Sequence, residues 1–316
     1  MKSFRPDSSP RAEVAVGQGS DHRRLGRFAT YVACEVSRRV YRWTRSNWQV
    51  EQRIKALRAR LGAVPRGGVG MRLEELDPAL DRRVAALREP DRELVVADFD
   101  QNGQIASRFG AIAGVATISR QDFMTRSGFP VLLVDLNGRL GVRKEFRNRG
   151  RFAQELEALL DLEAKDCPVP RLMNVDWEKG ALTVTFVPGD VVRELLAEAG
   201  ADIRDRDTDG TYSRVIDRQR IRSGRDHVPK VLTERHVHRV ASGLNAIHEA
   251  GFVLEDVKFG NIILRAETGE PVFIDLERAL PVASLPQLLA DHLREIDLKK
   301  FREHFGEAPQ AQRDAA

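Results

Sequence analysis

The sequence predicts an α+β fold in which strand-forming segments precede a helix-rich part. Apolar runs on both sides of the Asn-Gly pair at residues 137–138 indicate a β-hairpin, and apolar runs over residues 168–173 and 181–187 indicate two more strands. Apolar residues spaced three and four apart indicate helices over residues 151–163 and 233–250. With 316 residues, of which 42% are hydrophobic, the chain is long enough for two packed parts and an extension.

The N-terminal segment is strongly basic. Residues 1–66 contain fifteen Lys and Arg against five Asp and Glu, a net charge of +10, and because the whole chain is +4, residues 67–316 carry −6. The polar residues 1–20 are expected to be disordered. Over residues 25–61 apolar side chains recur every three or four positions, which predicts one long amphipathic helix or two helices broken near Asn47.

Two interpretations of this basic segment stay open. In the first, its apolar side packs on the rest of the chain or on a second copy, with the arginines in solvent. In the second, the helix lies on an anionic membrane surface with the help of Trp43 and Trp48. No recognised nucleic-acid-binding motif accompanies the charge, so we expect no specific nucleic acid partner.

The chain divides into four predicted regions. These are a polar tail (1–20), a basic helical extension (21–90), a strand-rich region (91–188) and a helix-rich region (189–316). Cys34 and Cys167 match no metal or redox spacing, and no secretory signal or long apolar run is found. We therefore expect a cytoplasmic protein, which the membrane interpretation would place peripherally at the inner face of the membrane.

The most informative stretch spans residues 252–277. It places Asp256, Lys258 and Asn261 in one loop and a second acid, Asp275, at the end of an apolar run. The segments between them read as two short strands joined by a glycine-containing turn, a hairpin that returns Asp275 to the neighbourhood of the loop. Two carboxylates and an amide can hold a divalent cation and leave one acid to orient a hydroxyl group. This chemistry serves phosphoryl transfer.

The sequence Asp-Val-Lys-x-x-Asn, followed by Ile-Asp-Leu-Glu, resembles the catalytic loop and metal-binding motif of the protein-kinase superfamily. The resemblance implies that Asp256 orients the substrate hydroxyl or accepts its proton, and that Lys258 steadies the transferring phosphoryl group. Asn261 and Asp275 would be ligands of Mg²⁺, and ATP would be the phosphoryl donor. The implied fold is bilobal and protein-kinase-like, with an antiparallel sheet in the N-lobe (91–188) and a reduced helical C-lobe.

A kinase also needs a strand lysine and a helical acid that pairs with it. Lys144 ends the second strand of the predicted hairpin and resembles that lysine, whereas Arg143 would replace it only if the strand register shifted by one. On the helix over residues 151–163, Glu155 is the expected partner of Lys144. Glu157 is the alternative.

The resemblance implies two further contacts with the nucleotide. Ser127 and Gly128 stand where kinases have a glycine-rich phosphate loop. Phe186 and Val187 fall at the junction between the two lobes, where backbone groups contact the adenine.

Residues 200–230, rich in Arg and Asp, are predicted to form a mobile insertion at the mouth of the site. His248 is expected to interact with carbonyl groups at its helix end.

Forty-one residues follow Asp275, too few for the large helical subdomain of ordinary protein kinases. The chain thus resembles the small atypical branch, which includes lipopolysaccharide-core Kdo and heptose kinases and RIO-like kinases. The hydroxyl-bearing substrate is a sugar or a protein Ser/Thr: the Ile-Asp-Leu-Glu-Arg-Ala sequence favours the former and Lys258 the latter. Leu254 replaces a common histidine and Glu277 a common glycine. These departures motivate an alternative, a pseudokinase that acts as a nucleotide-binding or membrane-associated scaffold.

Overall fold

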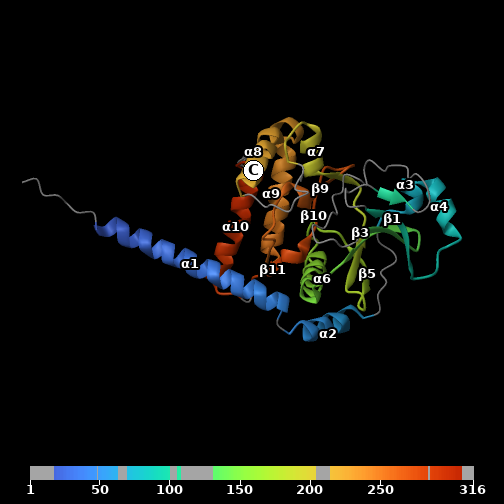
Figure 1. The fold of residues 1–316 in the computed structure, drawn as a ribbon, viewed down its shortest axis with the longest axis horizontal. Helices are drawn as coiled ribbons and strands as arrows, with labels where there is room; N and C mark the ends of the chain where they lie inside the picture. Colours follow the sequence, from blue (N-terminus) through green and yellow to red (C-terminus); the bar gives the residue numbers. More distant parts are fainter. Residues whose placement is uncertain are drawn as a thin grey trace, which may run out of the picture.

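The computed structural model describes residues 18–47, 49–62, 70–99, 105–107, 131–203, 214–283 and 285–307. Within these ranges the fold is α+β with antiparallel sheets, as predicted for its class. In Figure 1 the main sheet lies on one side, the helices that follow it in the sequence gather on the other, and helix α6 lies between them. The sheet strands, in spatial order, are β2 (Ile105–Ser107), β1 (Glu93–Phe99), β3 (Val131–Leu136), β4 (Arg139–Glu145), β6 (Ala181–Thr185) and β5 (Leu172–Asp176).

The predicted hairpin is formed by β3 and β4. Asn137 and Gly138 connect the strands with φ values of 54° and 80°, the left-handed geometry that a tight hairpin turn requires. The resulting register pairs Lys144 with Val131 on one side and with Leu182 of β6 on the other. Lys144 is therefore held on an interior strand of the sheet.

Helix α6 (Arg149–Glu163) follows the sheet strand that carries Lys144. It begins after Asn148, whose side chain accepts a hydrogen bond from the Arg151 N–H at 3.0 Å and so satisfies one free donor of the first turn. Phe152 and Leu156 are fully buried in the main hydrophobic core. The helix is consequently fixed against both the sheet and the helical part.

The helical part and its short strands follow β6. Its helices are α7 (Val192–Glu198), α8 (Arg214–Val231), α9 (Glu234–Glu249) and α10 (Gln287–Phe305). One small sheet contains β7 (Gly189–Val191), β9 (Ile262–Arg265) and β10 (Pro271–Phe273), and another contains β8 (Phe252–Val253) and β11 (Leu280–Pro281). The pairing of β9 with β10 confirms the second predicted hairpin.

Part of the segment predicted as a mobile insertion, residues 200–230, is helical, since helix α8 begins at Arg214, while residues 204–213 lie outside the described part. Near its C-terminal end α8 buries Val228 in the main core. A Cβ atom at Gly224 would lie 2.4 Å from the ring of Phe259, so glycine permits close packing there. The sequence did not indicate this helix, because its few apolar residues lie among many arginines and show no clear helical period. Packing against the rest of the chain supplies the stability that the isolated helix lacks.

The N-terminal segment forms two helices, α1 (Gln18–Asn47) and α2 (Val50–Leu61), which confirms the predicted break near Asn47. Between them Gln49 adopts a left-handed backbone conformation. Helix α2 buries Ile54 and Leu57 in the main core. For α2, the interpretation that the apolar side packs on the chain itself is therefore correct.

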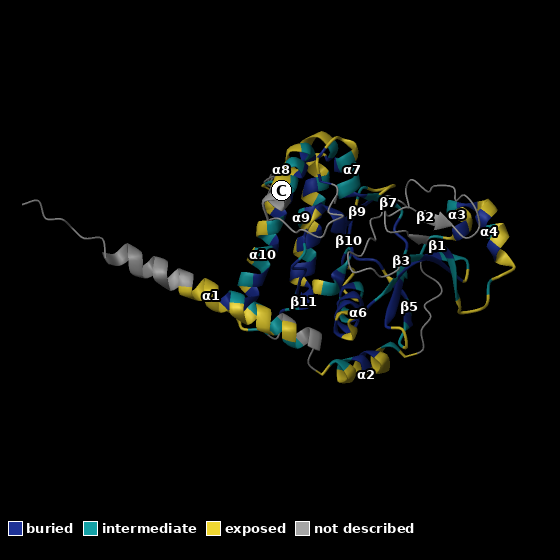
Figure 2. Cartoon of the chain, in the orientation of Figure 1, coloured by how far each residue is buried: buried dark blue, intermediate teal, exposed yellow. Residues whose placement is uncertain are grey.

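Helix α1 packs differently. The side that carries Cys34 and Tyr41 contacts the rest of the chain, whereas Val32, Val36 and Val40 are exposed. Cys34 is buried beside Val253 of β8 and Leu293 of α10, and the Tyr41 hydroxyl donates to the Pro281 carbonyl at 2.8 Å. Figure 2 shows exposed residues along the part of α1 that crosses the body.

Two short helices, α3 (Leu73–Leu76) and α4 (Pro78–Ala85), pack on the main sheet. They bury Leu73, Leu80 and Val84 against apolar side chains of β1, β3 and β4. None of the helices in the described ranges is both long and apolar enough to cross a membrane.

Truncating a buried residue of α2 should destabilise the chain, whereas truncating an exposed residue of α1 should not. Leu57→Ala is expected to lower the free energy of unfolding by about 2–4 kcal/mol, because it removes buried apolar surface and leaves a cavity. Val36→Ala, at a position 56% exposed, should change it by no more than ~0.5 kcal/mol. Urea unfolding measures both, and equal effects would contradict this division of the two helices.

Candidate active site

The loop between β8 and β9 brings three predicted site residues together. The Asn261 side-chain amide donates to the Asp256 carbonyl at 3.0 Å and to its carboxylate at 3.3 Å. Lys258 Nζ lies 2.9 Å from the same carboxylate. Among the described residues, no donor contacts the amide oxygen of Asn261, which leaves that oxygen available to a ligand.

The hairpin of β9 and β10 delivers the fourth residue. The Ile274 N–H donates to the Asn261 carbonyl at 2.9 Å, so the next residue, Asp275, lies beside the loop. Asp275 has φ 60°, a left-handed conformation that Asp tolerates better than most residues. Glu255, directly before Asp256, has φ 56°. Such conformations gather at functional sites, where the surrounding structure holds them.

Lys144 joins the sheet to this loop. Its Nζ lies 2.8 Å from Glu155 Oε2, 2.6 Å from Asp275 Oδ1 and 3.9 Å from Glu277 Oε2. The ion pair expected between Lys144 and Glu155 is therefore confirmed.

Neither alternative residue takes part in this contact. Arg143 points to the other face of the sheet, where it pairs with Glu93 at 2.7 Å and Asp176 at 2.8 Å. Glu157 pairs with Arg53 of α2 at 2.7 Å. Because successive side chains of a strand face opposite ways, the observed register decides in favour of Lys144.

The Lys144 cluster holds more negative than positive charge. Burial lowers the pKa of Lys144, but Glu155, Asp275 and Glu277 outweigh it and raise that pKa above its ordinary value. Burial raises the pKa of Glu155 to about 7, against the lowering effect of Lys144. One ammonium group faces three carboxylates, and Arg151 pairs with one of them, Glu277, at 3.0 Å. Carboxylates still outnumber cations, so the cluster would be stabilised by a further cation.

These residues fit a magnesium ion that arrives with phosphate groups. Asp275 offers a carboxylate and Asn261 an amide oxygen, and Mg²⁺ in nucleotide sites commonly takes one or two protein oxygens together with phosphates and water. Among the described residues no group of three His, Cys, Asp or Glu side chains could hold a metal ion. Two oxygen donors would leave the remaining positions of such an ion to phosphate groups and water.

Asp256 has the opposite environment, since cations surround it. Lys300 Nζ lies 3.9 Å and Arg278 Nη1 4.0 Å from its Oδ1, in addition to Lys258. Burial raises the pKa of Asp256, but Lys258, Arg278 and Lys300 together hold it below its ordinary value. Asp256 is thus ionised at neutral pH and can accept a hydrogen bond from a hydroxyl group.

A buried acid that the sequence reasoning missed anchors the loop. Asp297 of α10 is fully buried and accepts hydrogen bonds from the N–H groups of Leu254 at 2.7 Å and Glu255 at 2.8 Å. It also lies 3.1 Å from His248 Nε2. The expectation that His248 contacts helix-end carbonyls is therefore wrong. The only signal in the sequence was an acid on the apolar face of a helix.

The expected adenine contacts are only partly compatible with the structure. The Phe186 N–H already donates to the Leu140 carbonyl at 3.2 Å, so that donor is not available to a nucleotide. Val187 is buried next to it. Ser127 and Gly128, the predicted phosphate loop, lie outside the described residues.

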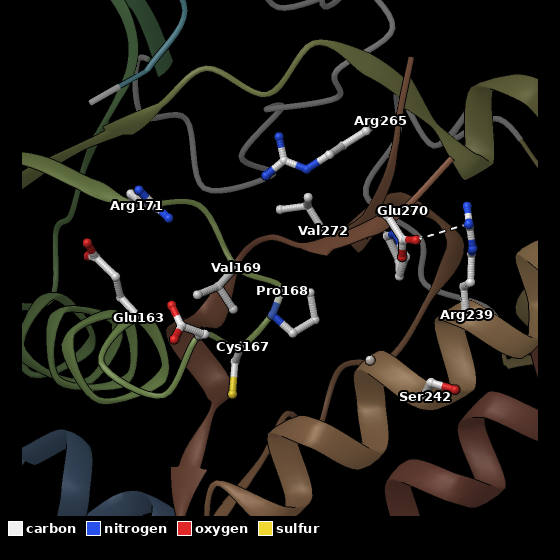
Figure 3. A pocket seen from close by; sticks show the side chains of 13 residues that line it. Glu163, Cys167, Pro168, Val169, Arg171, Arg239, Ser242, Arg265, Glu270 and Val272 are labelled. Atoms are coloured by element: carbon white, nitrogen blue, oxygen red, sulfur yellow. Dashed lines mark ion pairs between the residues drawn. The ribbon is translucent and has the colours of Figure 1, made fainter. Parts of the chain in front are cut away.

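A cavity of about 460 Å³ lies elsewhere, between the segment after α6, helix α9 and the β9–β10 hairpin (Figure 3). Figure 3 shows Arg239 paired with Glu270 at its edge, a contact of 3.2 Å. None of the predicted site residues lines this cavity. We therefore assign the candidate site to the Lys144 and Asp256 clusters rather than to this cavity.

No protein-family model matches the chain, and a search of curated proteins finds no match. The functional argument accordingly rests on the geometry of the site and on its motifs.

Replacing Glu155 should change how stability depends on pH. A carboxyl group whose pKa is raised in the folded state binds its proton more tightly there, so its contribution to stability is lost as the pH rises through about 7. Glu155→Gln removes this contribution. The stability advantage of the wild type over this variant should therefore shrink by roughly 1–3 kcal/mol between about pH 5 and about pH 8.

Urea unfolding at the two pH values measures this change. Glu157→Gln on the same helix provides the comparison for a carboxylate that contacts Arg53 instead of Lys144. A wild-type advantage over Glu155→Gln that grows with pH would contradict the expectation.

Removing the carboxylate of Asp297 should be strongly destabilising. Asp297→Ala leaves two buried N–H groups and an imidazole without their acceptor, which costs roughly 2–5 kcal/mol of unfolding free energy. Asp291→Ala on the same helix is the matched control. Its exposed side chain makes only surface contacts, so the change should stay within ~0.5 kcal/mol. Similar losses in both variants would exclude the anchoring role.

Proposed function

We propose that the chain is an ATP- and magnesium-dependent phosphotransferase of the protein-kinase-like superfamily that acts on a hydroxyl group. The observation that carries this proposal is the double contact of Lys144, at 2.8 Å from Glu155 and 2.6 Å from Asp275. A kinase requires a strand lysine paired with a helical acid beside the metal-binding acid. The three residues come from separate segments of the chain, β4, α6 and the residues after β10.

The proposed fold is bilobal. The antiparallel sheet with α6 would form the N-lobe, and the helices from α7 onward would form the C-lobe, with the site between them. Residues 274–279, Ile-Asp-Leu-Glu-Arg-Ala, support placement near the small atypical kinases, which include lipopolysaccharide-core sugar kinases and RIO-like kinases.

In the proposed reaction each side chain has one task. Asp256, ionised and hydrogen-bonded to Asn261, would orient the acceptor hydroxyl and receive its proton. Lys258 would contact the phosphoryl group in transit, and Lys144 the phosphates of the donor. Asn261 and Asp275 would hold Mg²⁺, which would neutralise negative charge on the phosphate groups. The chain would thus act mainly by positioning the reactants and balancing charge.

Two acceptor classes, a sugar and a protein Ser/Thr, fit this site. The alternative function is a nucleotide-binding scaffold without transfer activity. Glu277 favours this alternative, because it stands at the usual glycine position and pairs with Arg151 at 3.0 Å. This ion pair connects α6 to the segment after β10. The contacts of Lys144 with Glu155 and Asp275, and of Asp256 with Asn261, favour the enzyme.

Nucleotide binding and transfer test the proposal together. ATP with Mg²⁺ should raise the thermal midpoint of the wild type, and phosphate should pass from ATP to an acceptor. Asp256→Asn should retain nucleotide-dependent stabilisation and lose roughly 100-fold or more of the transfer rate. Asp275→Asn should lose both the magnesium-dependent stabilisation and the transfer. Asp291→Asn, on the surface of α10, should retain both.

Each result discriminates between the candidates. Stabilisation by ATP and Mg²⁺ without transfer to sugars or to Ser/Thr peptides supports the scaffold. An absence of nucleotide-dependent stabilisation in the wild type excludes both candidates.

A further inference from the structure

Helix α1 carries large hydrophobic side chains that are exposed on one of its sides. Val32, Val36, Val40 and Trp43 follow one another at intervals of four, four and three residues and so share one side of the helix. Their exposed fractions are 42%, 56%, 57% and 63%. We call these four residues the outer face of α1. Of the seven large hydrophobic residues exposed in the described part of the chain, they and Tyr31 make up five.

The opposite side of α1 is fixed to the body, so the outer face cannot turn inward. Cys34 is buried beside α10, and Glu35 lies 3.2 Å from His292 of that helix. Arg38 pairs with Glu255 at 3.2 Å, and Tyr41 donates to a backbone carbonyl of β11. These contacts keep the outer face of α1 pointing away from the body of the protein.

The charge of α1 decides which partner fits this face. The helix contains seven arginines against Asp21 and Glu35, a net charge of +5. Arg39, beside Val40, is exposed and pairs with no acid in the described residues. An anionic surface would attract this basic helix while the apolar side chains of the outer face leave water.

We propose that the outer face of α1 binds an anionic lipid membrane surface. Valine side chains and a tryptophan suit the boundary between head groups and acyl chains, and arginine side chains reach the lipid phosphates. The helix would lie in the plane of the surface with its inner face still on the body. This proposal goes beyond phosphoryl transfer and does not depend on it.

Co-sedimentation of the full chain with vesicles tests the proposal. Vesicles of phosphatidylcholine with about one third phosphatidylglycerol should bind the chain at least tenfold more tightly than pure phosphatidylcholine, and added salt should reduce this difference. Val36→Gln with Val40→Gln should weaken binding to the anionic vesicles at least tenfold. Leu87→Gln, an exposed leucine outside α1, is the matched control and should bind like the wild type.

Two further measurements keep the result interpretable. Hydrogen exchange of the wild type should show vesicle-dependent protection in α1, which holds even if the double variant folds poorly. Sedimentation velocity without lipid reports any dimer. Equal or absent binding to both vesicle types would overturn the proposal. So would a wild-type dimer that the double variant abolishes, because it would assign the outer face to a second copy.

Discussion

The ammonium group of Lys144 is the contact on which the candidate site depends, because it joins three separate parts of the chain. It belongs to β4, while Glu155 comes from α6 and Asp275 follows β10. In a buried environment a paired charge is strongly held, and an unpaired one is costly. Separating the sheet, the helix or the hairpin would break these ion pairs. Packing and site geometry are coupled through this one group.

The helices that surround the site hold the same elements from outside. Helix α2 contacts α6 through the pair of Arg53 and Glu157. Helix α1 reaches Glu255, the neighbour of Asp256, through Arg38, and α10 holds the backbone of that loop through Asp297. The loop is thus positioned by helices that precede it and follow it in the sequence. Glu255 in this loop and Asp275 after β10 both have left-handed backbone conformations, which the surrounding contacts hold in place.

An excess of negative charge and an excess of positive charge lie in different parts of the site. Around Lys144 carboxylates are in excess, whereas around Asp256 the cations Lys258, Arg278 and Lys300 are in excess. In the proposed function the acidic side would receive the metal and the basic side would stabilise the phosphoryl group in transit. The protonation states follow the same division, since Glu155 takes up a proton readily and Asp256 does not.

The sequence by itself determined the local structure: the two hairpins, the helices with clear periodicity and the order of the site residues, since each depends on neighbours within a few positions. The tertiary structure alone decided the rest. The apolar stripe of the N-terminal segment was visible in the sequence, but α2 buries its share and α1 exposes it. Asp297 and Arg38 gained their roles from partners 42 and 217 residues away. Periodicity shows which side chains share a face, whereas contacts between distant segments decide which face is covered.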